Sequence, residues 1–63
     1  MTEVGELRFK IVRVETAGQQ VLARLSNVIV ARAAFDVSVS LWPSAWIELR
    51  QDARVIEKHG ARG

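Results

Sequence analysis

Residues that could carry catalysis or bind a metal are scarce in this chain. It has 63 residues, a single histidine, His59, and no cysteine. A metal centre needs several clustered ligands, and a nucleophilic catalyst needs a base beside its nucleophile. His59 lies close to the C-terminus, where we expect a solvated, frayed tail. The sequence therefore predicts neither a metal site nor a catalytic nucleophile.

Carboxylates and glycines add no catalytic pattern. Glu48 and Glu57 fall on one expected hairpin beside basic residues, where cross-strand ion pairing accounts for them better than an acid–base pair does. The four glycines are scattered, and none links a strand to the start of a helix as a phosphate-binding loop requires. We therefore predict that the protein is not an enzyme and holds no cofactor.

Basic side chains offer a different chemistry, the binding of phosphates. Seven of them fall on expected strands and could form one surface for nucleic acid: Arg8, Lys10, Arg13, Arg24, Arg50, Arg54 and Lys58. Trp46 lies near arginines in this pattern, and an aromatic ring between cations can stack a base. Glu48 and Glu57 intrude among the cations, and the formal net charge is only +2. A weak, salt-sensitive nucleic-acid-binding domain is therefore the alternative prediction for function.

The elements that must position these residues begin with two strands. Residues 7–11 alternate apolar and basic side chains, the period of a strand with one buried face. From Val12 onward the alternation is shifted by one residue, so that Val12 and Val14 occupy positions that basic residues would be expected to fill. Either a bulge lies near Ile11 and Val12, or Val12 and Val14 emerge on the second face of the strand. After a polar connection that contains a glycine, residues 21–25 form another strand, and the short spacing predicts a hairpin.

The segment that follows decides the fold, because two templates compete there. Residues 35–41 alternate apolar and polar side chains as a strand would, and their valines are poor helix formers. A helix has better ends, however, since Ser26 or Asn27 can cap its first turn and Pro43 can stop it. A run from Asn27 to Trp42 is also too long for one typical strand. We therefore predict a helix.

Helical periodicity also assigns faces to this segment. Arg32, Asp36 and Ser40 fall on one polar side. The opposite side should pack on the sheet and gathers Val30, Ala31, Ala34, Val37, Leu41 and Trp42. For Trp42, a place in the core is favoured over a place on an exposed surface.

A second hairpin closes the chain. Residues 46–50 alternate as a strand, and residues 54–58 form another after a tight turn at 51–53. Asp52 suits this turn, but Ala53 stands where glycine would be favoured, so the turn either avoids positive φ there or bears about 1 kcal/mol of strain. The order ββαββ predicts an α+β domain in which one helix packs on a four-stranded antiparallel sheet.

This order of elements resembles that of a known group of proteins. The residues that carry the resemblance are a strand pair, the Ala-Arg-Ala-Ala-Phe helix at 31–35, and a hairpin with Ile-Glu-Leu-Arg at 47–50 and Arg-Val-Ile-Glu at 54–57. The chain resembles short bacterial ββαββ proteins, common in proteobacteria, that are domains of unknown function. The resemblance covers about residues 7–58 and implies the helix, but it implies no activity and no functional residue. Those proteins usually carry glycine where this chain has Ala53.

A sheet covered by one helix leaves its second face open, and we expect the function there. Val12, Val14 and Trp46 would be exposed on that face, and exposed apolar clusters usually mark interaction sites. Arg50 would lie beside them, and tryptophan and arginine are strongly enriched in interface hot spots. The sequence therefore predicts an interaction module with Val12, Val14, Trp46 and Arg50 as its interface residues.

The length of the chain favours self-association. Residues 1–63 are expected to form one small domain, with an ordered core at about 7–58 and frayed ends. A domain of this size buries only about 60% of the surface that its unfolded chain exposes, so a partner subunit would add stability. We expect a homodimer, or a complex with another protein, formed through the open sheet face or an edge strand.

Targeting features are missing from the sequence. No segment is long and apolar enough to cross a bilayer, and residues 1–6 lack the basic start and apolar run of a secretory signal. Together with the absence of cysteine, this predicts a cytoplasmic protein without membrane contact.

Overall fold

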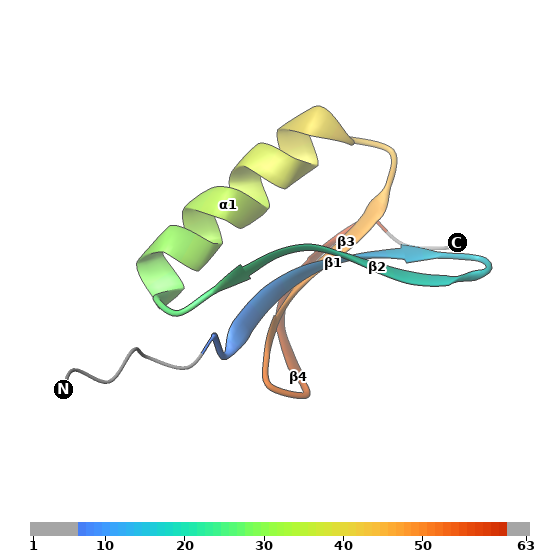
Figure 1. Cartoon of the computed structure of the whole chain (residues 1–63). Helices are drawn as coiled ribbons and strands as arrows, with labels where there is room; N and C mark the ends of the chain where they lie inside the picture. Colours follow the sequence, from blue (N-terminus) through green and yellow to red (C-terminus); the bar gives the residue numbers. More distant parts are fainter. Residues whose placement is uncertain (1–6, 61–63) are drawn as a thin grey trace, which may run out of the picture.

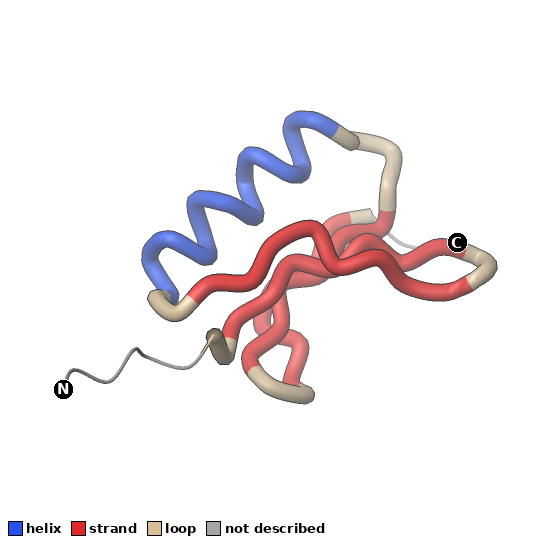
Figure 2. The backbone as a smooth tube through the Cα atoms, viewed as in Figure 1, coloured by secondary structure: helices blue, strands red, loops and turns tan. Residues whose placement is uncertain are grey.

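The computed structural model describes residues 7–60, and its elements follow the predicted order ββαββ (Figures 1 and 2). They are β1 (Phe9–Glu15), β2 (Gly18–Leu25), α1 (Val28–Leu41), β3 (Trp46–Gln51) and β4 (Arg54–His59). The strands form one antiparallel sheet in the order β2-β1-β3-β4, and α1 lies across one face of it (Figure 1). The prediction of an α+β fold is confirmed.

The strand register resolves the phase inversion in β1. Ile11 is opposite Ala23 of β2, and Val12 is opposite Val21, so the extra residue between these pairs lies in β2. β1 itself alternates without interruption. Val12 and Val14 consequently emerge on the face opposite Ile11, and the central strand has an apolar side toward each face of the sheet.

The core lies between α1 and the sheet face that it covers. Ile11, Ile47 and Leu49 are fully buried on the sheet side. From α1, Ala31 and Phe35 complete the buried cluster. Partly buried apolar residues surround this cluster, and Ala34 and Trp42 contact it as predicted.

The ends of α1 are defined by the residues that the sequence indicated. The side-chain oxygen of Asn27 accepts hydrogen bonds from the backbone N–H groups of Ile29, at 2.7 Å, and Val30, at 3.2 Å. These bonds satisfy two of the donors that every helix leaves open at its N-terminus. Trp42 is the C-terminal cap and Pro43 follows it. The choice of a helix over a strand is therefore confirmed.

The buried side of α1 differs from the sequence-based assignment. Val30, Val37 and Leu41 are 53%, 57% and 62% exposed, so the prediction that they pack on the sheet is wrong. Phe35 sets the buried side instead, and it lies about 160° around the helix from Val37 at 100° per residue. Because burial of a large aromatic ring contributes more than burial of a valine, α1 turns Phe35 inward and the valines outward.

The C-terminal hairpin decides between the two alternatives for its turn and corrects the expectation for His59. Positive φ falls on Asp52, at 55°, and not on Ala53, so the turn avoids the strain that alanine would bear. His59 is not part of a frayed tail, because it ends β4 and its Nε2 atom lies 2.9 Å from the carbonyl oxygen of Pro43. Gly60 follows with a φ of 77°. The expected frayed ends at 1–6 and 61–63 lie outside the described residues.

Candidate interaction surfaces

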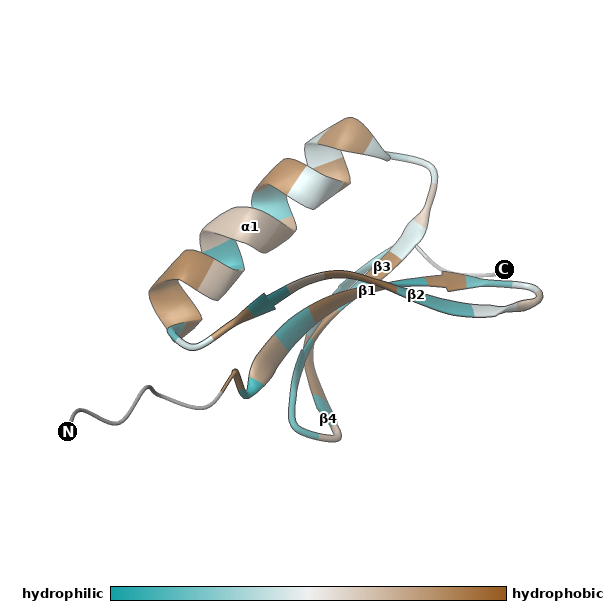
Figure 3. Ribbon diagram, viewed as in Figure 1, coloured by the Kyte–Doolittle hydropathy of each residue, from teal (hydrophilic) through white to brown (hydrophobic). Residues whose placement is uncertain are grey.

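The side of α1 that points away from the sheet is apolar. Of the eight large hydrophobic residues that are exposed among residues 7–60, five belong to α1, and Figure 3 shows hydrophobic residues recurring along its whole length. We call Ile29, Val30, Val37 and Leu41 the outer helix face. Ile29 is 74% exposed, the highest value of the set. Ala33 is exposed between them and leaves room for close approach.

Charged residues flank the outer helix face. Arg32 pairs with Glu57 of β4, which ties α1 to the edge of the sheet. Glu57 was expected to pair across the hairpin, and that expectation is wrong because the helix supplies its cation. Asp36 lies on the same side of α1 as Arg32 and forms no ion pair with any residue from 7 to 60.

The sheet face opposite α1 carries the residues that the sequence predicted as an interface. Val12 lies beside Glu48, Val14 lies beside Trp46, and Arg50 lies beside Lys10. The alternation of the four strands places a larger set on this surface, which we call the open sheet face: Lys10, Val12, Val14, Gln19, Val21, Arg24, Trp46, Glu48, Arg50, Val55 and Lys58.

A hydrogen-bonded network closes the centre of the open sheet face. Glu48 accepts a bond from Trp46 Nε1 at 2.9 Å and bonds from Arg50 Nε and Nη2 at 2.8 and 2.6 Å. Arg50 also reaches Gln19 at 3.2 Å. Val12 has no exposed surface on this face, because side chains of the face cover it. Glu48 thus pairs within its own strand and not across the hairpin, which corrects the second ion pair expected from the sequence.

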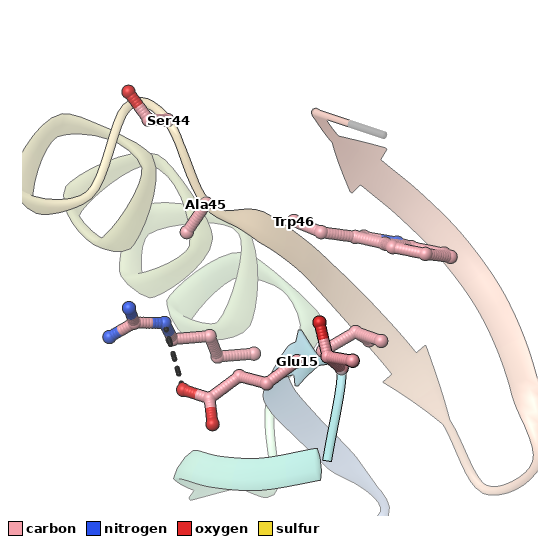
Figure 4. Close-up of a pocket in the computed structure, with 7 residues that line it drawn as sticks. Glu15, Ser44, Ala45 and Trp46 are labelled. Carbon is pink, nitrogen blue, oxygen red and sulfur yellow. Dashed lines mark ion pairs between the residues drawn. The ribbon is translucent and has the colours of Figure 1, made fainter. Parts of the chain in front are cut away.

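Trp46 stands beside a shallow hollow at the end of the sheet. Figure 4 shows Trp46 after Ser44 and Ala45 along the chain, with its side chain directed away from Ser44 and with Glu15 on a separate strand. The hollow has a volume of about 450 Å³, and its wall includes the ion pair between Arg13 and Glu15, at 3.3 Å. Within residues 7–60, no three His, Asp or Glu side chains come close enough together to hold a metal ion.

The seven cations that the sequence proposed for nucleic acid do not share one face. Arg13 lies on the covered side, where its guanidinium sits 5.8 Å from the ring centre of Trp42. Arg8 pairs with Asp52 at 2.8 Å at the end of the sheet, and its hydrogen bond holds the pKa of that carboxyl below its usual range. Arg54 starts β4, opposite Gln51. The open sheet face brings together the other four: Lys10, Arg24, Arg50 and Lys58.

Sequence reasoning missed the outer helix face. One signal was available, because Ile29, Ala33, Val37 and Leu41 recur every four residues and so form one apolar side of α1, opposite Phe35. Over residues 7–60, no helix has the length and apolar character that a bilayer span requires. Comparisons of the chain with known protein families, curated proteins and solved structures find no match. The resemblance to short proteobacterial proteins stays a prediction.

Proposed function

We propose that the chain is a non-enzymatic interaction module that self-associates, and that α1 packs against α1 of a second copy through the outer helix face. The observation that carries this proposal is the exposed apolar side of α1, from Ile29 at 74% to Val37 at 57% and Leu41 at 62%. Contiguous apolar patches on small proteins usually mark interaction sites. Because cysteine is absent from the sequence, we expect the module to act in the cytoplasm.

The exposed area is sufficient for a weak dimer. The exposed fractions of the five apolar residues of α1 amount to nearly three complete side chains. Full burial of a valine, leucine or isoleucine contributes about 1.5–3 kcal/mol, so burial in two copies contributes about 9–17 kcal/mol. Loss of translational and rotational freedom costs about 4–15 kcal/mol. The midpoints of the two ranges differ by about 3–4 kcal/mol, which corresponds to a weak dimer with a dissociation constant in the millimolar range.

The flanks of the outer helix face suit a two-fold pairing with a second copy. α1 has 14 residues, so it is about 21 Å long. When two such helices pack antiparallel about a two-fold axis, the same flank of both copies lies on the same side of the contact. The residues of that flank then follow one another in opposite directions in the two copies. Asp36 of one copy then lies on the same side as Arg32 of the other, and Ala33 near the middle permits close contact. The contact falls in the small interface class, typical of transient assemblies.

Self-association through the open sheet face or an edge strand is the arrangement that the sequence favoured. The strands with a free edge are β2 and β4. The geometry supports this arrangement less than the helical one, because Val12 has no exposed surface and the Glu48 network occupies the centre of the face. Trp46 and Val14 remain partly accessible on it.

Light scattering over a concentration series, at low and high salt, tests the proposal. The wild-type mass should rise from 7.0 kDa toward twice that value and should persist in salt, since the contact is apolar. Val37→Asp should remain monomeric. Val55→Asp adds the same charge at an exposed valine of β4 and should dimerise as the wild type does. Circular dichroism verifies that each variant is folded.

Two outcomes would contradict this arrangement. A monomer at every accessible concentration would exclude self-association altogether. A dimer that survives Val37→Asp but dissociates in Trp46→Ala would move the interface to the open sheet face.

A further inference from the structure

The net positive charge of the described chain lies on one surface. Residues 7–60 carry eight Lys and Arg against five Asp and Glu. Four of these cations and one of the acids belong to the open sheet face, which leaves four cations and four acids for the rest. The open sheet face therefore has a formal charge of +3, and the remainder of residues 7–60 is neutral.

Three of the cations form a single row across the sheet. Arg24 of β2 is directly opposite Lys10 of β1, and Lys10 is directly opposite Arg50 of β3. Like charges in directly opposed positions destabilise a sheet. Among the described residues, only Arg50 has a carboxylate partner in this row, namely Glu48, while Lys10 and Arg24 form no ion pair. An anion from outside the chain would relieve this repulsion.

Glu48 is the single acidic residue of the open sheet face, and it does little to repel such an anion. The Glu48 side chain is only 8% exposed, and both of its carboxylate oxygens accept hydrogen bonds, one from Trp46 and the other from Arg50. Lys58 lies directly opposite Glu48 on β4 and forms no ion pair within residues 7–60. The surface that a ligand meets is therefore cationic on both sides of the network.

An aromatic ring lies next to this charge. Trp46 is held by its bond to Glu48, and Val14 lies directly opposite it on β1. Trp46 is half-buried and is one of the residues that line the hollow. Proteins that bind single strands combine cations that follow the phosphates with an aromatic ring that stacks a base. A peptide of Asp and Glu alone would use the cations but would have no ring to stack on the tryptophan.

We infer that the open sheet face binds single-stranded nucleic acid, with Lys10, Arg24 and Lys58 toward the phosphates and Trp46 toward a base. This inference is independent of the proposed dimer, because α1 and the open sheet face lie on opposite sides of the sheet (Figure 1). Ligand binding therefore persists in Val37→Asp, whether or not the wild type self-associates.

Fluorescence anisotropy with a labelled oligo(dT) measures this binding. Three to four phosphate contacts give a slope of log K against log salt of about −2 to −3 for a single strand. The affinity then falls about 20- to 50-fold between 50 and 200 mM salt. A binding constant that does not change with salt, or no binding at 50 mM salt, would overturn the inference.

Two exposed arginines that form no ion pair with any residue from 7 to 60 give a matched comparison. Arg24→Gln removes a cation from the open sheet face, and it should weaken binding about 3- to 10-fold and make the salt slope shallower by about 0.7. Arg54→Gln makes the same change in net charge away from that face and should leave both values unchanged. Equal losses in the two variants would show a general charge effect and would overturn the site.

Tryptophan fluorescence tests the contact with a base. The chain has two tryptophans, so Trp42→Phe leaves Trp46 as the single reporter. Oligo(dT) should quench its emission, whereas polyglutamate should compete weakly and cause no quenching. Competition by polyglutamate as strong as that by oligo(dT), without quenching, would overturn the inference and assign the face to an acidic protein.

Discussion

The Glu48 network makes a sharp prediction about stability, because it is a nearly buried ion pair on a small sheet. The side chains of Glu48 and Arg50 are 8% and 19% exposed, and Glu48 accepts three hydrogen bonds. Glu48→Gln keeps the shape of the side chain but replaces one acceptor oxygen by an amino group. In either orientation, that amino group faces an N–H donor of Trp46 or Arg50. The variant therefore loses bonds and leaves Arg50 without its counter-charge.

The size of the effect follows from the burial of the pair. Removal of one partner of a buried ion pair costs about 3–5 kcal/mol. Arg50 keeps some contact with water at the sheet surface, so we expect a loss of about 2–3 kcal/mol in the free energy of unfolding. Glu57→Gln is the matched control, because its partner Arg32 is 55% exposed and Glu57 is 39% exposed. An exposed pair of this kind contributes about 0.2–1 kcal/mol.

Urea unfolding followed by circular dichroism measures both variants. In the Val37→Asp background, any dimer is removed and does not add to the stability. With an m-value of about 1 kcal/mol/M, Glu48→Gln should lower the midpoint by about 2–3 M, and Glu57→Gln by less than about 1 M. Equal shifts for the two variants would refute the reasoning, since burial would then have no influence on the strength of the pairs.

Three further predictions concern the backbone and one exposed carboxyl. Gly60→Ala should lower the melting temperature, measured in thermal melts, more than Gly18→Ala does. Both glycines have positive φ, but only at Gly60 would an added Cβ lie 2.5 Å from a backbone oxygen. Asn27→Ala should cost about 1 kcal/mol in urea unfolding, since it removes the N-terminal cap of α1. The hydrogen bond from Arg8 lowers the pKa of Asp52 below its usual value, so this pair stabilises the fold above the usual pKa of an aspartate, and the contribution is lost as the pH falls through the lowered pKa. Urea midpoints of the wild type and Asp52→Asn should therefore converge on acidification, and a constant difference down to the lowest pH would contradict this.

The sequence predicted the elements because each rests on local chemistry. Asn27 and Pro43 define the helix regardless of what the helix contacts, and the two-residue period of β1 follows from the pleat. The parity of β3 was likewise sufficient to place Trp46 and Arg50 on the face opposite Ile47.

What the sequence could not predict depends on which partners meet in space. Apolar residues occur on two sides of α1, and only the size of Phe35 against the sheet decides which side is buried. Glu57 pairs with Arg32, 25 positions away, because the fold brings the long side chain of Arg32 within reach of β4. Periodicity within a strand contains no such information.

The strand order also sets the sequence in which the fold can assemble. β1 pairs on one edge with β2, its neighbour in the chain. Its other edge pairs with β3, where Val14 lies opposite Trp46, and the segment between these two residues includes the whole of α1. Closing such a loop costs chain entropy before any contact between β1 and β3 is gained, and non-local strand pairing slows folding. Two local hairpins and a capped helix therefore form early, and the joining of β1 to β3 limits the rate. Substitutions in that seam, such as Val14→Ala, should slow refolding, and loss of the Asn27 cap should slow it as well, because the capped helix forms before the barrier.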